Sequence, residues 1–383
     1  MHDNLPGTPP LVRAVNRRLI LDRVRQSGEV SRAELAKLTD IRPPTVSAVI
    51  KQLINEGLVE EIGNGESNTR TGRPPRLVAL ARRRPQAVGF EVSGSLIRGA
   101  LCDLRGEPSE QALLPYAPDT PERTVDRLFE TGERLLRKCG LRWLDMQGVG
   151  VALPGLVDTS HGVVRWSRPF AWRDVPRGAI CESRGGLATD VMNNVVAGSM
   201  AAHFLGEARH SRNLIFIHMR FDVVEPGTPA DAVRLGSGII INGEPYHGAF
   251  GAAGEISRLV VHPLAYARDA EGQPFANTAA LESAYLDGLP SAVEAMDRVA
   301  GDISNYVIHA INFLDPGVVV LGSDHEVLRD AVLDRLERIL AEDALRQEVG
   351  TTEIMASTLG EFGMVRGAVV PTLQRVFRMP RWS

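Results

Sequence analysis

The stretch that decides the fold of the N-terminal part of the chain is SRAELAKLTDIRPPTVS, residues 31–47. Its first and fourth residues, Ser31 and Glu34, have the spacing of a capping box, which begins a helix. The polar turn DIR follows that helix. Pro43 and Pro44 come next, and proline suits the first turn of a helix because the N–H groups there have no partner within the helix. The stretch therefore predicts two helices joined by a tight turn.

The flanking residues extend this stretch to a module that covers residues 11–81. Residues 11–27 have apolar side chains at helical spacing and end at a Ser-Gly stop. Residues 58–62 and 77–80 have the composition of two short strands, and the polar loop 63–76 between them is rich in Gly, Asn, Thr and Arg. This order is typical of a winged helix-turn-helix, a module that places its second helix in the major groove of DNA.

The net charge of the 383-residue chain is only −4, but it is unevenly distributed. Residues 1–86 carry 15 Lys and Arg against 9 Asp and Glu, a net charge of +6, so the remainder carries −10. A basic N-terminal module on an acidic body is typical of a protein that binds a polyanion through its head. Chance unevenness would explain the charge alone, but not its coincidence with the helix-turn-helix.

The pattern changes from Gln86 onward. Three strands, a helix and then alternating strands and helices are predicted, and this order occurs twice. It favours two similar α/β lobes with a cleft between them. We expect a winged helix domain with its linker at residues 1–85, a first lobe at 86–205 and a second lobe at 206–383, whose last helix packs back on the first lobe.

The cysteines and the hydropathy exclude several classes of protein. Cys102, Cys139 and Cys181 are far apart and odd in number, so they signal neither a disulfide framework nor a zinc site. The first ten residues lack the apolar core of a signal peptide, and no run of 18 apolar residues occurs. We therefore expect a cytoplasmic protein with no membrane partner.

Several short motifs occur in an order that resembles one family. Those in the N-terminal module are Asn16-Arg17, SRAELA (31–36), TVS (45–47), LINEGLV (53–59) and GRP (72–74). Those in the remainder are LPGLVD (153–158), GAAGEI (251–256) and DPGVVVLG (315–322). Together they resemble the ROK family of repressors, open reading frames and kinases, and in particular its regulator branch. The resemblance covers nearly the whole chain and implies a two-lobed actin-like (ribonuclease H-like) ATPase fold behind the winged helix.

The second helix of the helix-turn-helix supplies the candidate contacts to DNA. Once its apolar stripe is set aside, the outward residues, with one from the preceding turn, are Arg42, Pro44, Thr45, Ser47, Ala48 and Lys51. Thr45 and Ser47 can bond base edges or phosphates, and Ala48 can contact a thymine methyl. Lys51 and Arg42 suit phosphates, which position the protein without reading sequence. The alternative is that Thr45 and Ser47 only cap a surface helix.

A further arginine lies in the loop of the wing. In Gly72-Arg73-Pro74 the proline keeps Arg73 extended, which suits insertion into a narrow, A·T-rich minor groove. The alternative is that Arg73 is an ordinary linker residue.

The kinase motifs that the resemblance implies are degraded here. The first phosphate loop of the family, Asp-x-Gly-Gly-Thr, is Glu91-Val-Ser-Gly-Ser, and the second has Arg234 in place of a glycine. The catalytic segment Glu-Asn-Asp-Ala-Asn is Met-Asn-Asn-Val-Val at 192–196, which places Asn194 at the general base. An amide cannot accept the proton, and loss of a base costs roughly a hundred- to ten-thousand-fold in rate. We expect no enzyme activity and no ATP cofactor.

The zinc site of the family is also absent from the sequence. Arg258 stands where relatives carry a histidine, and Gln273, Phe275 and Ala280 stand where they carry cysteines. Zinc sites of this kind use imidazole and thiolate ligands, so we expect no metal. His247, like His262, lacks partners at ligand spacing.

The sugar site that the resemblance implies is partly kept. Asn193, Glu255 and Glu282 stand where the family bonds sugar hydroxyls, and Asn194 can still bond a hydroxyl. Arg258 adds a fixed charge with five donors. It would favour an acidic or phosphorylated sugar, or it would close the pocket through an ion pair with Glu255 or Glu282.

These observations predict a transcription regulator, more specifically a repressor, that acts as a dimer or tetramer on a palindromic double-stranded operator. Its two-lobed domain would sense a sugar-like effector. One alternative is that this domain binds no small molecule and serves only for oligomerisation or partner docking. An active sugar kinase with a DNA-binding head is the third hypothesis, and Asn194 argues against it.

Overall fold

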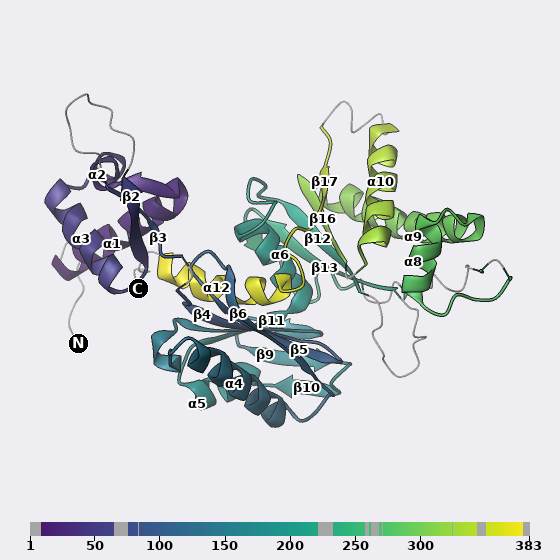
Figure 1. Cartoon of the computed structure of the whole chain (residues 1–383), viewed down its shortest axis with the longest axis horizontal. Helices are drawn as coiled ribbons and strands as arrows, with labels where there is room; N and C mark the ends of the chain where they lie inside the picture. The colour runs from purple at the N-terminus through teal and green to yellow at the C-terminus, as the bar shows by residue number, and fades with distance from the viewer. Residues whose placement is uncertain are drawn as a thin grey trace.

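The computed structural model describes nearly all of the chain and has three parts in a row (Figure 1). The described residues are 9–64, 76–82, 84–220, 233–256, 260–261, 268–269, 271–323, 325–342 and 350–377. A helical module at the N-terminus is followed by two lobes, each built on its own sheet. We propose that the three parts correspond to residues 1–85, 86–205 and 206–383.

The N-terminal module is a winged helix-turn-helix. Its elements are α1 (Pro9–Ser27), β1 (Glu29–Ser31), α2 (Arg32–Thr39), α3 (Pro43–Asn55), β2 (Val59–Asn64) and β3 (Arg76–Leu80). As the sequence predicted, the Ser31 hydroxyl accepts a hydrogen bond from the Glu34 N–H at 3.1 Å and begins α2, and α3 begins at Pro43. Between the helices Asp40 adopts a left-handed conformation with φ of 54°. The strands form an antiparallel sheet in the order β1-β3-β2, so the module has a third strand that the sequence analysis missed.

The first lobe has a five-stranded sheet in the order β11-β7-β4-β5-β6 and a small antiparallel sheet in the order β10-β9-β8. Its strands are β4 (Ala87–Val92), β5 (Leu96–Cys102), β6 (Pro108–Pro115), β7 (Gly148–Leu153), β8 (Leu156–Asp158), β9 (Val163–Ser167), β10 (Trp172–Val175) and β11 (Thr189–Asn193). Its helices are α4 (Pro121–Lys138), the short η1 (Trp143–Asp145), α5 (Arg177–Gly185) and α6 (Asn194–Phe204). Every residue of β4 and β7 is buried, as expected for parallel central strands that are covered on both faces.

The second lobe has a mixed sheet in the order β14-β13-β12-β16-β17, with β15 paired to β13. Its strands are β12 (Leu214–Arg220), β13 (Val233–Ile241), β14 (Glu244–Pro245), β15 (Val260–Val261), β16 (Val318–Ser323) and β17 (Glu353–Ala356). Its helices are α8 (Thr278–Leu286), α9 (Pro290–Leu314) and α10 (Glu326–Glu342). The helices α9 and α10 share one apolar cluster with β12, β13 and β16 and cover the outer face of the sheet.

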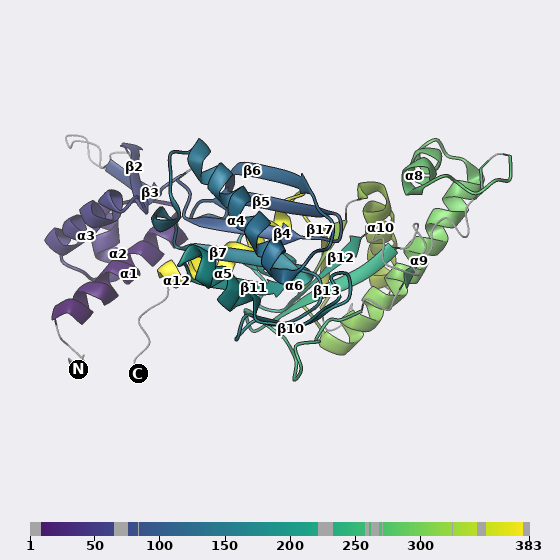
Figure 2. The same cartoon turned by 90° about the horizontal axis from the view of Figure 1, so that it is seen from below.

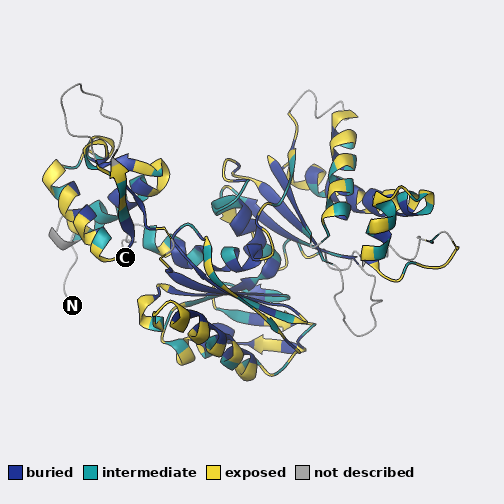
Figure 3. Ribbon diagram, in the orientation of Figure 1, coloured by how far each residue is buried: buried dark blue, intermediate teal, exposed yellow. Residues whose placement is uncertain are grey.

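Two helices fill the space between the lobes. The last helix, α12 (Gly363–Phe377), lies against β4 and β7 of the first lobe, and α6 lies against β12 and β13 of the second. The two helices also pack directly on each other. Arg375 of α12 pairs with Asp190 of β11 at 2.7 Å. Figure 3 shows that both helices belong to the buried centre of the molecule, whereas exposed residues gather on the outer helices.

The C-terminal end of α12 reaches the winged helix. Leu373 belongs to the same apolar cluster as Ile20 of α1, and the Arg25 guanidinium lies 5.2 Å from the centroid of the Phe377 ring. In Figure 2 this end of α12 lies beside α1. One helix therefore contacts the winged helix, the first-lobe sheet and α6.

No helix in the described part of the chain is long and apolar enough to cross a membrane. The three cysteines are unpaired; Cys102 and Cys181 are buried and Cys139 is exposed. Burial raises the pKa of Cys102 to about 12 and that of Cys181 to about 11, so both thiols stay protonated and unreactive at neutral pH.

The first lobe buries one arginine completely. The Arg177 guanidinium stacks over the Trp172 ring at 4.9 Å, and none of its nitrogens has a hydrogen-bond partner among the described residues. Burial lowers its pKa. Because a buried charge without partners is costly, Arg177→Met is expected to raise the free energy of unfolding by about 1–3 kcal/mol. Chemical denaturation measures this, with Arg184→Met at an exposed position as the control. A less stable Arg177→Met protein would contradict it.

Candidate nucleic-acid interface and effector cleft

The solvent face of α3 carries the predicted DNA contacts. Arg42, Pro44, Ser47, Ala48 and Lys51 are exposed, and Thr45 is half-buried. The residues between them face the core: Val46, Val49, Ile50 and Leu53 are buried. The structure therefore brings all six residues to one side of the module. Arg73 lies outside the described residues.

Internal ion pairs fix α3 and the wing. Glu56, at the C-terminal end of α3, accepts a hydrogen bond from Gln52 at 2.8 Å and pairs with Arg17 of α1. Arg17 and Glu56 are 39 residues apart, so no local sequence pattern predicts this link.

The second pair network holds the wing. Glu61 of β2 pairs with Arg76 of β3 at 2.6 Å and with Arg32 of α2 at 2.8 Å. The hydrogen bond from Arg76 is the main cause that lowers the pKa of Glu61, so this carboxylate stays ionised at neutral pH. Arg32 and Arg76 therefore hold the wing in place, and neither belongs to the exposed face of α3.

Asn193 and Asn194 lie where β11 passes into α6. The Asn193 side chain caps α6: its oxygen accepts from the Val195 N–H and its amide donates to the Gly155 carbonyl, both at 2.8 Å. Asn194 is buried, and its side-chain oxygen accepts from the same Val195 N–H at 3.0 Å. Both predicted residues therefore help to hold the start of α6.

The second lobe approaches the same point. The Val195 backbone packs so tightly on β13 that a Cβ at Gly238 would overlap its carbonyl oxygen. The neighbouring Ser237 hydroxyl donates to the Gly254 carbonyl at 2.8 Å. A Cβ at Gly254, where φ is +76°, would lie 2.5 Å from the carbonyl oxygen of Ser237. Glu255 follows and is exposed. The structure thus brings Asn193, Asn194 and Glu255 to one region between the lobes; we use the name effector cleft for the region that these three residues define.

Glu282 does not join this group. It lies on α8, where its carboxylate pairs with His325 at 2.8 Å and accepts a hydrogen bond from the Leu328 N–H at 3.4 Å. It is therefore bound to the first turn of α10, and in Figures 1 and 2 α8 lies at the far end of the second lobe. The assignment of Glu282 to a sugar by resemblance stays a prediction. Arg258 lies outside the described residues, and so do both of its expected ion pairs.

An acidic turn borders the effector cleft. Asp158, at the end of β8, accepts hydrogen bonds from the Ser160 hydroxyl at 2.6 Å and from Arg165 at 2.9 Å. The Ser160 hydroxyl and then His161 hold the pKa of Asp158 well below its usual range. Burial lowers the pKa of His247, an effect that the nearby Asp158 opposes. Asp158 is the last residue of the LPGLVD motif, and no role was predicted for it from the sequence.

Ion pairs compensate the charge of Glu91, the acid in the segment that resembles the first phosphate loop. Glu91 is buried, and its carboxylate pairs with Arg220 of the second lobe at 2.9 Å and with Arg98 of β5 at 3.4 Å. Arg98 also pairs with Glu361, just before α12, at 3.4 Å. Guanidinium groups from both lobes therefore form ion pairs with the Glu91 carboxylate, which the resemblance would place facing a nucleotide. We call these four residues the Glu91 network.

The Glu91 network is expected to contribute to stability as a coupled unit. Arg220→Met should lower the free energy of unfolding by about 1–3 kcal/mol, because it leaves a buried carboxylate with one partner fewer. The double variant Glu91→Gln/Arg220→Met should lose less than the sum of the single variants, since each single change strands the other group. Chemical denaturation checks this, with Arg298→Met at an exposed pair on α9 as the control. Additive losses would mean that the two lobes are not joined here.

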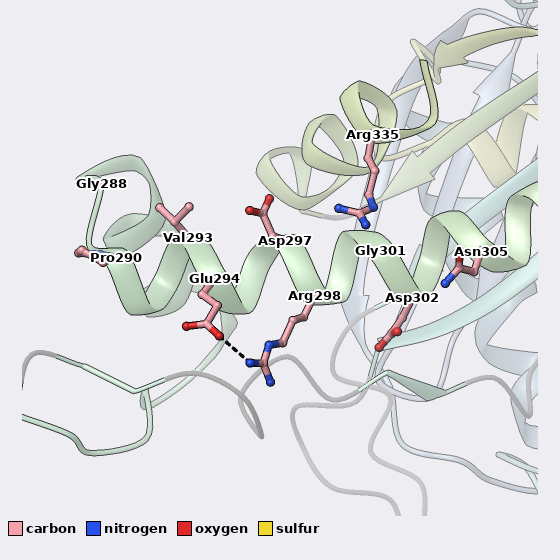
Figure 4. A pocket seen from close by; sticks show the side chains of 10 residues that line it. All are labelled: Gly288, Pro290, Val293, Glu294, Asp297, Arg298, Gly301, Asp302, Asn305 and Arg335. Atoms are coloured by element: carbon pink, nitrogen blue, oxygen red, sulfur yellow. Dashed lines mark hydrogen bonds and ion pairs between the residues drawn. The ribbon is translucent and has the colours of Figure 1, made fainter. Parts of the chain in front are cut away.

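A separate open cavity of about 880 Å³ lies on the outer surface of α9 and α10 (Figure 4). Charged residues from both helices line it, including Asp297, Asp302 and Arg335, and Glu294 and Arg298 are paired along its edge. None of its lining residues belongs to the effector cleft.

The sequence predicts that the second lobe lacks the zinc site of the family. Within the described ranges no group of three or more His, Cys, Asp or Glu is arranged to hold a metal ion. Gln273, Phe275 and Ala280 offer no thiolate ligand.

A winged helix-turn-helix joined to a two-lobed sugar-kinase-like fold defines a class of DNA-binding regulators, and known proteins agree. Residues 14–60 match the family model "Winged helix-turn-helix DNA-binding", and residues 87–272 match that of the ROK family. The chain therefore carries a ROK-family region behind a winged helix-turn-helix and is a homologue of DNA-binding transcriptional repressors. The predicted family and fold are confirmed.

The similarity to relatives is low but extends over the chain. The xylose repressor of Caldicellulosiruptor bescii is 22% identical over 98% of this chain and 100% of its own length. The transcriptional dual regulator NagC of Escherichia coli is 22% identical over 95% of both. Among solved structures, a ROK-family transcriptional regulator homologous to Escherichia coli Mlc has a TM-score of 0.71 at 19% identity and covers 96% of this chain and 97% of its own. A ROK hexokinase from Thermus thermophilus has a TM-score of 0.58 at 22% identity, over 76% of this chain and 98% of its own.

Proposed function

We propose that this protein is an operator-binding repressor whose two-lobed domain senses a sugar-like effector and no longer transfers phosphate. The observation that carries the proposal is the position of α12. It packs on α6, which begins at Asn193 and Asn194 in the effector cleft, and its other end packs on the winged helix. A ligand that shifts the start of α6 therefore has a continuous packed route to the DNA-binding head.

On DNA, two winged helices of a dimer or tetramer bind the half-sites of a palindromic operator. Thr45, Ser47 and Ala48 contact bases, Arg42 and Lys51 contact phosphates, and Arg73 enters the minor groove. Arg73→Ala should weaken binding to A·T-flanked operators, and equal affinity would remove the minor-groove contact.

Two features support the loss of kinase activity, one in the effector cleft and one in the Glu91 network. Asn194 can bond a sugar hydroxyl but cannot accept its proton. Glu91 is neutralised by Arg98 and Arg220. No ATP-dependent sugar phosphorylation is therefore expected.

The test measures binding of the purified protein to its own promoter region by gel shift, over a range of salt concentrations. Since relatives are named xylose repressor and N-acetylglucosamine repressor, the panel of ligands contains both sugars, D-glucose and their phosphates. Tight, salt-sensitive binding that one sugar releases is the expected result. Absence of specific binding would overturn the repressor assignment.

A second candidate is a domain that serves only for oligomerisation or docking of a partner. It is favoured by Glu282, which is bound to α10, and by Asn193, whose amide is already used by the backbone. In that case no sugar of the panel would raise the melting temperature, whereas ligand binding to the folded state must raise it.

A further inference from the structure

Two large aromatic side chains are exposed beside the effector cleft, one on each lobe. Trp166 of β9 is 45% exposed, and Phe250, in the loop that leads to Glu255, is 91% exposed. Exposing an aromatic ring forgoes the stabilisation that its burial would give, and aromatic side chains dominate the energetics of binding sites. Neither residue entered the sequence analysis, because exposure cannot be read from a single apolar residue in a strand or loop.

Trp166 is joined to the cleft through the backbone. It pairs with Leu156 of β8 and with Arg173 of β10, in the row of the small sheet that faces away from the core. The neighbouring pair, Ser167 with Trp172, is buried. The Trp166 carbonyl lies so close to Gly155 that a Cβ there would overlap it, and Gly155 accepts the hydrogen bond from Asn193.

The loop that carries Phe250 comes from the second lobe and approaches β8. The next residue, Gly251, has φ of +72°, and its Cβ position lies 3.5 Å from the Val157 carbonyl oxygen of β8. His247, on the other side of Phe250, senses the Asp158 charge at the end of β8. The loop 247–254 therefore runs along β8, and β9 with Trp166 is the next strand of that sheet.

We propose that Trp166 and Phe250 form an aromatic pair that receives the C–H face of a sugar ring, while the polar groups of the effector cleft bond its hydroxyls. This inference rests on the proposed function and adds the chemical class of the effector. A pyranose carries an apolar face of C–H groups and an edge of hydroxyls. Aromatic rings on two lobes match the former, and the Asn194 amide with the Glu255 carboxylate matches the latter. Because the rings come from different lobes, a bound sugar favours one interlobe distance.

The pair is tested by the effect of sugars on operator binding and on tryptophan fluorescence. The chain has four tryptophans, so the signal of Trp166 is the part that Trp166→Phe removes. With D-xylose, N-acetylglucosamine or D-glucose as the probe, the releasing sugar should change the emission of the wild type saturably, and Trp166→Phe should lose that change but keep release from the operator. Trp166→Ala and Phe250→Ala should each need about three- to tenfold more sugar for half-maximal release.

The control variant is Phe313→Ala, which removes an equally exposed phenylalanine (86%) from the end of α9. Operator affinity without sugar must be unchanged in all variants, which shows that they fold. If a sugar releases the wild type and both alanine variants at the same concentration, the aromatic pair is wrong and the sensor function stands. If no sugar releases the wild type, the sensor function fails, and the aromatic pair fails with it.

Discussion

Gly367→Ala is expected to be the most destabilising single-methyl change in the part of the chain that the structure describes. The Cβ of an alanine at this position would overlap the Ala197 carbonyl oxygen, which is backbone of α6 and cannot rotate away. The helices α12 and α6 would have to separate, and both are packed between two sheets. We expect a loss of about 3–5 kcal/mol in the free energy of unfolding, or no folded protein at all.

The matched control is Gly94→Ala, because no atom lies within 4 Å of the position that its Cβ would take. That variant should unfold within about 0.5 kcal/mol of the wild type in urea. Since α12 also packs on the winged helix, Gly367→Ala should lose operator binding together with stability, and Gly94→Ala should lose neither. An unchanged urea midpoint for Gly367→Ala would show that α12 and α6 do not pack in this way.

The parts of the fold that local chemistry decides were predictable from the sequence. The helix α2 begins with a hydrogen bond between Ser31 and Glu34, which are three residues apart, and α3 begins at Pro43. The strand β1 was missed because its three residues are too few to show a period and its partner, β3, lies more than 40 residues later. Sequence patterns report on neighbours along the chain, and β1 exists only through a distant one.

The candidate site shows the same division. The resemblance supplied the candidate residue types, but the partners of those residues depend on contacts between distant segments. Glu91 was recognised as a retained acid, whereas the Arg220 that neutralises it comes from the other lobe, 129 residues later. Glu282 was predicted to bond a sugar, and its pair with His325, 43 residues later, could not be predicted from the sequence. A motif fixes which side chain is present, and the packing of the lobes decides what that side chain can still bind.

Ala48→Glu is expected to abolish specific operator binding without unfolding the protein. Ala48 is exposed on α3 between Ser47 and Lys51, and glutamate is a good helix former, so stability should change by no more than about 0.5 kcal/mol. In the major groove the longer, negative side chain would meet base edges and phosphates. Operator affinity should fall at least about 100-fold, which corresponds to about 2.7 kcal/mol.

Fluorescence anisotropy with labelled operator at fixed salt measures this loss, and Ala279→Glu, an exposed position on α8, adds the same charge away from the winged helix as the control. Lys51→Ala then separates positioning from sequence recognition. If Lys51 contacts a phosphate, its loss should weaken operator and random DNA alike and reduce the salt slope by about one. If instead Ala48→Glu binds the operator as tightly as Ala279→Glu does, α3 does not enter the groove. The wing would then have to carry the recognition, since β2 and β3 are the remaining part of the module that commonly contacts DNA.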